Sequence, residues 1–256
     1  MAERTIYVSL TSIFHNQFEL LETLKSIKAQ TLQPTKTFIY LSTTPYLADE
    51  GFPTANTTYT QLTQFLLTNS ENFEVRWTMN TGPYRKLLPL LKETWNDDCL
   101  IITIDDDTVY TPTLIQNYVA DYEQYKCCIS YRGFTPESID SDSIDYNNRQ
   151  PSIPKYLYNF HTGKGGVLYH PRFFHSTGTF IFEKPENFAP SADDIWFNLV
   201  RIANKIPCYI ETKSYMIGDY TNNKALCKLY NTNQSNTDSM REGLRLIEAQ
   251  GYLQKN

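Results

Sequence analysis

Three consecutive aspartates, Asp105, Asp106 and Asp107, follow the apolar run CLIITI at residues 99–104. Carboxylates this close together repel one another and lose solvation where a buried strand ends. A bound cation removes that cost, because carboxylate oxygens are the hard ligands that Mg²⁺ and Mn²⁺ prefer. Such an ion can bridge to a diphosphate and stabilise charge on a leaving group. The simpler alternative is an acidic turn in which Asp107 caps a helix that starts near Thr111.

The apolar pattern of the first half predicts strands that alternate with helices. This order predicts a parallel sheet with helices on both faces, and ligands bind at the carboxyl ends of such strands, where the aspartates fall. Pro89 is expected to kink or shorten the third helix. Strands are expected at 4–13, 36–43, 72–79 and 99–104, and helices at 18–30, 59–70, 84–96 and 111–125.

The second half has a looser pattern. Residues 135–164 are rich in Ser, Asp, Asn and Pro, and we expect a long loop there. A helix and then a strand are expected within 190–211, and a closing helix over 240–253. We therefore predict one domain, 1–256, with two halves at about 1–134 and about 135–256.

Composition narrows the function classes. A formal charge of −5 argues against a nucleic-acid partner, which needs a basic surface. No apolar run approaches the roughly 20 residues that span a membrane, and the N-terminus lacks a signal-peptide layout. The five cysteines show no metal-site spacing, so reduced thiols in a cytoplasmic protein are expected.

The aspartate cluster permits more than one chemistry. The pattern Asp105-x-Asp107 also fits haloacid-dehalogenase-type phosphatases, whose first Asp is a nucleophile, and Gly218 with Asp219 resembles a later acidic motif of that family. In those enzymes, however, the nucleophile normally follows the first core strand. Here three strand–helix units precede it.

With its acidic strand in fourth position, the chain resembles a nucleotide-sugar-dependent glycosyltransferase of the type A fold. More closely, it resembles a family-2-like group that makes bacterial or viral surface glycans. The resemblance implies an α/β fold with a mostly parallel central sheet flanked by helices. It also implies a Rossmann-like nucleotide half and a smaller acceptor half. Four stretches carry it: 7–42, NTGPYRKLLPLL at 80–91, IITIDDDTVYTP at 101–112, and GGVLYHP with SADDIWF at 165–171 and 191–197.

For the donor, the resemblance implies that Asp107, with Asp105, would hold Mn²⁺ or Mg²⁺ against the diphosphate. Asp105 would also face the ribose or sugar, and Asp106 the sugar or nucleotide. Thr11 and Ser12 would lie beside the base and ribose. UDP is the expected nucleotide, because Asp-x-Asp enzymes of this fold commonly use UDP-sugars.

Three further positions follow from the same motifs. Lys86 would approach the nucleotide or diphosphate, unless it is a solvated lysine in the first turn of a helix. Gly165 and Gly166 would let the backbone pass close to the bound sugar, or serve only a tight turn. Asn80 stands near the Gly-Pro pair, where such sequences often carry aspartate.

The SADDIW stretch bears on mechanism. An inverting transferase needs a carboxylate that takes the proton of the acceptor hydroxyl. The resemblance implies that Asp194 is this base and that Asp193 orients the sugar or acceptor. The alternative is structural, because Ser191 and Asp194 have the spacing of a capping box. Were Asp194 only a helix cap, a retaining mechanism would stay open.

The expected activity is hexosyl transfer from a nucleotide sugar to a glycan or lipid-linked glycan, and a lipid-linked acceptor allows peripheral membrane contact. A catalytically silent sugar-nucleotide-binding module is the alternative from another class. The histidines of the acceptor half could add a metal ligand but are more often structural, and Trp196 could stack on a sugar but has core spacing. These histidines are His161, His170 and His175.

Overall fold

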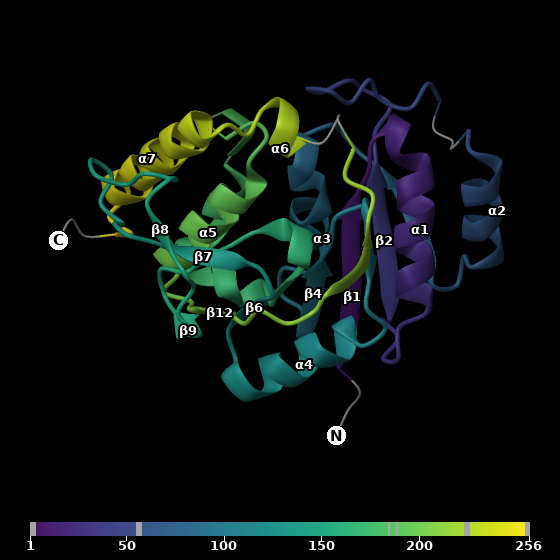
Figure 1. Ribbon diagram of the computed structural model, residues 1–256, viewed down its shortest axis with the longest axis horizontal. Coiled ribbons are helices and arrows are strands. Elements are labelled where there is room, and N and C mark those ends of the chain that lie inside the picture. The colour runs from purple at the N-terminus through teal and green to yellow at the C-terminus, as the bar shows by residue number, and fades with distance from the viewer. Residues whose placement is uncertain (1–3, 55–57, 184, 188, 223–225, 254–256) are drawn as a thin grey trace.

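The computed structural model describes residues 4–54, 58–183, 185–187, 189–222 and 226–253. Its main feature is an eight-stranded sheet with the order β3-β2-β1-β4-β11-β6-β12-β9 (Figure 1). The strands are β1 (Thr5–Thr11), β2 (Lys36–Leu41), β3 (Phe73–Trp77), β4 (Cys99–Thr103), β6 (Cys128–Ser130), β9 (Lys155–Tyr156), β11 (Val167–Tyr169) and β12 (Cys208–Ile210).

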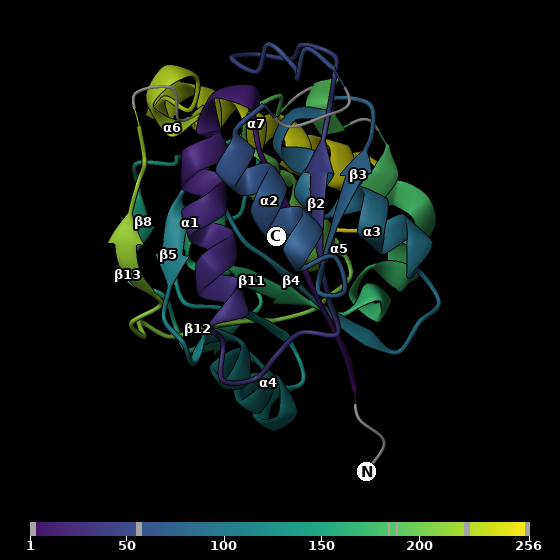
Figure 2. The ribbon, with the colours of Figure 1, turned by 90° about the vertical axis from the view of Figure 1, so that its right-hand side faces the viewer.

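The four strands of the first half are parallel, as the sequence predicts. β1 pairs with β2 and β4, and β2 pairs with β3. Almost all side chains of β2 and β4 are buried, which explains the continuous apolar runs of these strands. The helices after β1, β2 and β3 are α1 (Gln17–Lys28), α2 (Thr60–Thr68) and α3 (Leu88–Glu93). Figure 1 shows α1 and α3 on opposite sides of these strands, and Figure 2 shows α1 beside α2.

Pro89 shortens the third helix, as predicted. The expected helix over 84–96 is divided into a 3₁₀ turn, η2 (Gly82–Lys86), and the short α3. Pro89 lies in the first turn of α3, where a missing backbone N–H leaves no hydrogen bond unmade. The division places Arg85 and Lys86 in the turn rather than on a helix face.

The second half completes the same sheet. β11 runs antiparallel between β4 and β6, β12 is parallel to β6, and β9 is antiparallel to β12. The sheet is therefore mostly parallel, as expected, and strands of the two predicted halves interleave in it. The helices are α4 (Leu114–Tyr125), α5 (Asp193–Ala203), the short α6 (Leu226–Leu229) and α7 (Asn233–Ala249).

The closing helix is longer than predicted. α7 begins at Asn233 rather than near residue 240, because the Thr232 hydroxyl caps it by accepting a 3.1 Å hydrogen bond from the Ser235 backbone N–H. It packs against α5 (Figure 1).

The prediction of a continuous loop over 135–164 is wrong in part. Short strands occupy it, and two of them join β7 (Gly133–Pro136) in a second sheet with the order β10-β7-β8. Two-residue strands carry too few side chains to show an apolar alternation in the sequence. These strands are β8 (Arg149–Gln150), β9 and β10 (Phe160–His161).

A third, two-stranded sheet lies directly after the aspartates. β5 (Thr108–Tyr110) pairs antiparallel with β13 (Met216–Asp219). The remaining elements are the 3₁₀ segments η1 (Phe14–Asn16), η3 (Gly163–Gly165), η4 (Pro171–Phe182) and η5 (Pro185–Asn187).

The structure bears on two predictions from composition, reduced cysteines and the lack of a membrane-spanning segment. Cys99, Cys127, Cys128 and Cys208 are all buried free thiols. Within the part of the chain that the structure describes, no helix is long and apolar enough to cross a membrane.

Candidate active site

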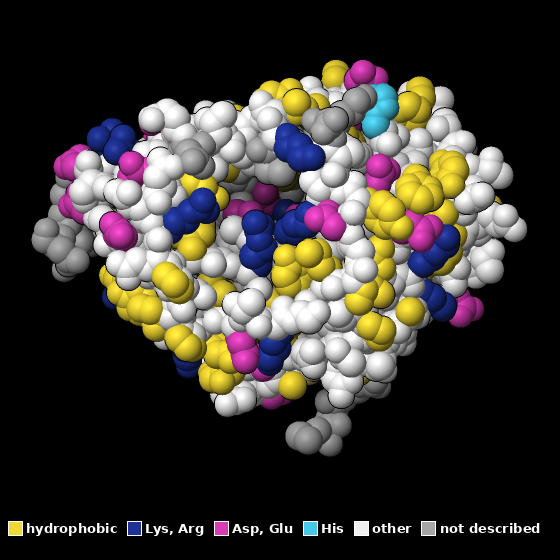
Figure 3. Space-filling model, in the orientation of Figure 1, with side chains coloured by type: hydrophobic (Ala, Val, Ile, Leu, Met, Phe, Trp, Pro, Cys, Tyr) yellow, Lys and Arg dark blue, Asp and Glu magenta, His cyan; other side chains and the backbone are white. Residues whose placement is uncertain are grey.

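A pocket of about 250 Å³ opens beside the end of β1 and the turn that follows β4. Figure 3 shows it as a hollow in which acidic and basic side chains gather. Both halves of the chain contribute to its wall, so a ligand here would contact both. The predicted site residues that line it are Thr11, Ser12, Lys86, Asp105, Asp106, Asp107, Asp193 and Asp194.

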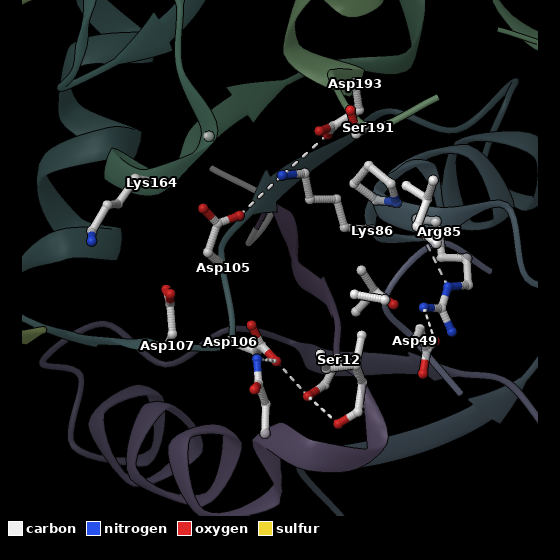
Figure 4. Close-up of a pocket in the computed structure, with 18 of the residues that line it drawn as sticks. Ser12, Asp49, Arg85, Lys86, Asp105, Asp106, Asp107, Lys164, Ser191 and Asp193 are labelled. Carbon is white, nitrogen blue, oxygen red and sulfur yellow. Dashed lines mark hydrogen bonds and ion pairs between the residues drawn. The ribbon is translucent and has the colours of Figure 1, made fainter. Parts of the chain in front are cut away.

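The Asp106 carboxylate points toward the Ser12 hydroxyl at the pocket wall (Figure 4). Its carboxylate accepts hydrogen bonds from the Ser12 hydroxyl and, at 3.2 Å, from the Asn16 amide. Burial and the neighbouring Asp107 raise the pKa of Asp106 to about 7. The Thr23 hydroxyl of α1 lies 2.9 Å from the backbone carbonyls of Asp106 and Thr108, and it fixes the turn that carries the three aspartates.

Asp105 lies on one side of the Lys86 ammonium, and Asp193 lies on the other (Figure 4). The distances from Lys86 Nζ are 3.0 Å to Asp105 Oδ1 and 3.1 Å to Asp193 Oδ2. Burial alone would lower the pKa of Lys86, but the carboxylates of Asp105, Asp193 and Asp194 hold it well above its ordinary value. The alternative of a solvated lysine is wrong, because the Lys86 side chain is only 8% exposed.

Asp107 is held by the small β5–β13 sheet. Its backbone carbonyl accepts a 2.8 Å hydrogen bond from the Tyr220 N–H. Burial and the charge of Asp105 raise its pKa. The capping alternative is wrong, because α4 begins at Leu114 with Thr113 as its N-cap and no side-chain capping bond.

Asp193 and Asp194 form the first turn of α5. The Asp194 carboxylate accepts a 3.0 Å hydrogen bond from the backbone N–H of Gly163. Burial and the charge of Asp193 raise the pKa of Asp194 to about 7. The capping box is not formed, because the N-cap is Ala192 without a side-chain bond and the Ser191 hydroxyl donates to Asn231.

A buried network that the sequence reasoning missed lies across the pocket. Asp49 Oδ2 lies 2.9 Å from Arg85 Nη2 and accepts a 2.8 Å hydrogen bond from the Asn80 amide. Asn80 in turn accepts a hydrogen bond from the Gly82 N–H at 3.0 Å. Arg85 is 1% exposed and lines the pocket, and its Nη1 has no partner among the described residues. A ligand acceptor atom in the pocket would satisfy it.

The donor set suits a cation that also binds a substrate phosphate. Among the residues that the structure describes, no group of three or more His, Cys, Asp or Glu side chains is placed to hold a metal ion. Mg²⁺ commonly takes only one or two carboxylates and completes its shell with phosphate oxygens and water. Asp105 and Asp107 both line the pocket and supply such carboxylates.

Other predicted residues lie outside the pocket. Gly165 and Gly166 do not line it. They form a tight turn in which the Gly166 N–H donates to the Gly163 carbonyl at 2.7 Å and Gly166 has φ +81°. Gly163 and Lys164 line the pocket instead. Thr11 does line it, and its hydroxyl donates to the Tyr40 carbonyl at 2.7 Å.

The histidines and Trp196 have structural partners. Trp196 is fully buried and donates to the Ile181 carbonyl at 2.8 Å, which confirms its core position. His170 contacts Asp98, His175 contacts the Trp95 carbonyl, and His161 contacts Tyr169. None of the three histidines lines the pocket.

Asp219, from the second motif of the phosphatase interpretation, already has hydrogen-bond partners within the protein. Asp219 accepts a hydrogen bond from Lys164 Nζ at 2.7 Å and from the Thr221 backbone N–H at 2.9 Å. It does not line the pocket that holds Asp105. The second motif therefore lies on β13 beside Thr108, next to the aspartates but outside the pocket wall.

Comparison with known proteins places the fold. No protein-family model matches the sequence, and no curated protein matches it either. Solved structures of S. aureus TarS, a glycosyltransferase, are similar in fold. TarS 1–349 matches with a TM-score of 0.56, 13% identity and coverage of 96% of this chain and 64% of TarS 1–349. The complex of TarS 1–349 with UDP-GlcNAc gives a TM-score of 0.60, with 13% identity and coverage of 96% and 66%.

This chain spans less than two thirds of TarS 1–349, and it covers 39% of a longer TarS structure. At this level of identity the similarity establishes the fold. The predicted α/β fold, with a mostly parallel central sheet flanked by helices, is confirmed.

Proposed function

We propose that this chain is a metal-dependent glycosyltransferase that moves a sugar from a UDP-sugar to a hydroxyl of a glycan or lipid-linked glycan, with inversion. One observation carries the proposal: a single pocket holds the aspartates that follow β4 and, facing them across Lys86, the acidic pair of α5. The fold similarity to TarS, which has been solved with UDP and with UDP-GlcNAc, supports a uridine nucleotide as the donor.

For the donor, we assign the base and ribose to the wall formed by Thr11, Ser12 and the Asp49–Arg85 pair. The unpartnered Nη1 of Arg85 supports this, because a bound nucleotide offers the acceptor atom that it lacks. Asp105 and Asp107 would hold Mn²⁺ or Mg²⁺. The bound cation would neutralise charge on the diphosphate leaving group.

For the acceptor, Asp194 takes the proton of the attacking hydroxyl. The hydroxyl oxygen forms the new bond to the anomeric carbon as the bond from that carbon to the diphosphate breaks, and UDP leaves. The pKa of about 7 supports this role, because a general base works best when its pKa lies near the working pH. Asp193, held by Lys86, orients the sugar or acceptor. A lipid-linked acceptor would bring the enzyme to the inner, cytoplasmic face of a membrane.

The test is isothermal titration of UDP, GDP and dTDP, each with Mn²⁺ and with EDTA, on wild type and Asp107→Ala. We expect UDP alone to bind, only with the metal, and not to the variant. The matched control is Asp97→Ala, an exposed aspartate outside the pocket, which should bind like wild type. Binding that ignores the metal, or survives in Asp107→Ala, would exclude a metal–diphosphate site at these aspartates.

Turnover separates an enzyme from a binding module. Asp194→Asn should keep UDP affinity yet lose sugar transfer, or transfer to water, by roughly 10²-fold or more. If wild type binds UDP-sugar with metal but never releases UDP, the chain is a sugar-nucleotide-binding module instead. The anomeric configuration of the product, read by NMR, tests inversion.

A further inference from the structure

A second cavity, of about 60 Å³, adjoins the donor pocket. The two cavities share Ser191, Asp193, Asp194 and Asn231 in their walls. Asp194, the proposed base, therefore faces both. On the scale of roughly 10–15 Å³ for one water molecule, the cavity has room for a few hydroxyl-sized groups but not for a second nucleotide. The rest of its wall consists of Phe134, Tyr146, Phe160, His161, Thr162, Ala192, Ile195, Asn198 and Asn236.

His161 is a wall residue with an unmet hydrogen-bonding group. It is 1% exposed, and Asn198 fixes its backbone through bonds of 3.1 Å to its N–H and 2.9 Å to its carbonyl. The same Asn198 amide bonds the Asp194 carbonyl at 2.7 Å, so it ties His161 to the helix turn of the proposed base. His161 Nδ1 has no hydrogen-bond partner within the described chain.

The hydrogen bond made by Nε2 determines whether Nδ1 of His161 is a donor or an acceptor. Burial, with the charges of Arg201 and Lys86, holds the pKa of His161 well below its ordinary value, so the ring is neutral. Its Nε2 lies 3.1 Å from the buried Tyr169 hydroxyl. If the phenol donates to Nε2, one buried donor, Nδ1–H, is left unpaired. The opposite tautomer would leave both the phenol hydrogen and the Nδ1 lone pair unpaired, which costs more.

We propose that this second cavity is the acceptor subsite and that it takes a polyhydroxyl group of a sugar or polyol. In it, His161 Nδ1–H donates a hydrogen bond to a hydroxyl next to the one that reacts. This inference rests on the proposed function, since it names the acceptor class of the same site. The stacked rings of Phe134 and Phe160, with centroids 5.9 Å apart, offer an apolar wall to C–H groups, and Asn236 adds an amide.

Two isosteric variants separate the roles of the ring nitrogens. In His161→Gln the side-chain amide reaches the Tyr169 hydroxyl in place of Nε2, but the Nδ1 donor is lost. In His161→Asn the amide nitrogen stands near the Nδ1 position and the Tyr169 contact is lost. The control is His175→Gln, because His175 is exposed and lies outside both cavities, where it contacts the carbonyl and the indole ring of Trp95.

Glycerol is the probe, as the smallest polyol, with UDP release from the sugar nucleotide as the readout. We expect His161→Gln to raise the KM for glycerol by roughly threefold to tenfold, the effect of one lost hydrogen bond, with an unchanged Kd for UDP. His161→Asn should stay within about twofold of wild type in that KM. Equal KM increases in both variants would overturn the proposal, because a purely structural histidine predicts them.

A measurement that needs no turnover completes the test. Long-range ¹H–¹⁵N NMR of the imidazoles should show His161 as the Nδ1–H tautomer, and its signals should move when glycerol is added to the UDP-bound protein. An Nε2–H tautomer, or signals that ignore glycerol, would overturn the proposal. Failure of the proposed function is distinct, since it appears as absent UDP binding in wild type, whatever the His161 signals do.

Discussion

Lys86 and Asp193 form a buried ion pair that joins the two halves of the chain. Nζ lies 3.1 Å from Oδ2, and the two side chains are only 8% and 6% exposed. Because Lys86 also contacts Asp105, one ammonium group sets the positions of the aspartate turn after β4 and the first turn of α5. The two sides of the pocket, to which we assign the donor and the acceptor, are thus aligned by a single side chain.

Replacing Lys86 should therefore destabilise the fold as well as the site. Lys86→Met leaves the buried Asp193 carboxylate and the partly buried Asp105 carboxylate without a counter-charge, which should lower the free energy of unfolding by about 3–5 kcal/mol. Urea denaturation measures this. Lys25→Met is the control, since Lys25 is half exposed and its pair with Glu22 should contribute less than about 1 kcal/mol.

The double variant Lys86→Met with Asp193→Asn tests the cause. Removing one of the stranded charges should restore part of the lost stability. If Lys86→Met unfolds at the wild-type urea concentration, or if the double variant is no better than the single, the ion pair is not what joins the halves.

Asp194 should give the activity a rising pH dependence. A base with a pKa of about 7 is deprotonated only above that pH, so transfer should increase as pH rises through about 7 and then level off. The rates should be measured at saturating donor. An inflection that persists in the residual activity of Asp194→Asn would assign it to another group.

The same raised pKa of Asp194 should make the stability of the fold decrease as pH rises, whereas the activity increases. Since the folded state binds the Asp194 proton more tightly than the unfolded state, stability should fall as pH rises from about 4 to about 7. Asp194→Asn should remove this part of the decline and unfold at higher urea than wild type at pH 8. Urea midpoints at pH 5 and pH 8 measure it, and an identical pH slope in both proteins would contradict it.

The sequence was sufficient for the parts of the fold and the site that local pattern determines. Continuous apolar runs identified β1 to β4, and the position of Asp105–Asp107 after the fourth strand placed the pocket. The DDI turn at the start of α5 was located by the same means. Each of these features is contained within a dozen consecutive residues.

Contacts between segments far apart in the chain could not be predicted from the sequence. Asp49 lies in a loop with no apolar period, and nothing local indicates that its carboxylate reaches Arg85, 36 positions away. The sequence predicted Gly165 and Gly166 at the pocket wall, but Gly163 and Lys164 line it instead, and this error also comes from a contact between distant segments. It depends on how η3 packs against Lys86 and Asp194, which a run of glycines does not specify.

Asn80 should not tolerate replacement by aspartate. Its amide donates to Asp49 at 2.8 Å and to the Thr44 carbonyl at 2.7 Å, and in Asn80→Asp a carboxylate would face both acceptors. We expect a loss of about 1–3 kcal/mol in the free energy of unfolding at pH 8. The loss should shrink toward pH 4, where the two carboxylates can share a proton.

Asn80→Ala is the matched comparison. It removes the donor without adding charge, so its loss of stability should not change with pH. Parallel pH dependences of the two variants in urea denaturation would show that charge repulsion with Asp49 is not the cause.

Gly163→Ala should impair catalysis more than folding. A Cβ at this position would lie 2.8 Å from Lys86 Nζ and 3.1 Å from Asp194 Oδ1, in the middle of the site. Gly163 does not have the positive φ that favours glycine, so the backbone accepts alanine, and the flexible end of Lys86 must move instead. Since small displacements of catalytic groups cost up to about 10²-fold in rate, we expect kcat to fall by tenfold or more.

Gly218→Ala separates this effect from a general cost of adding a methyl group. Its Cβ would meet only the Val109 side chain, at 3.3 Å, on the β5–β13 sheet outside the pocket. This variant should keep wild-type kcat, and both variants should unfold within about 1 kcal/mol of wild type. Comparable kcat values for the two variants would mean that a small displacement of the Lys86 ammonium between Asp105 and Asp193 has no consequence for the reaction.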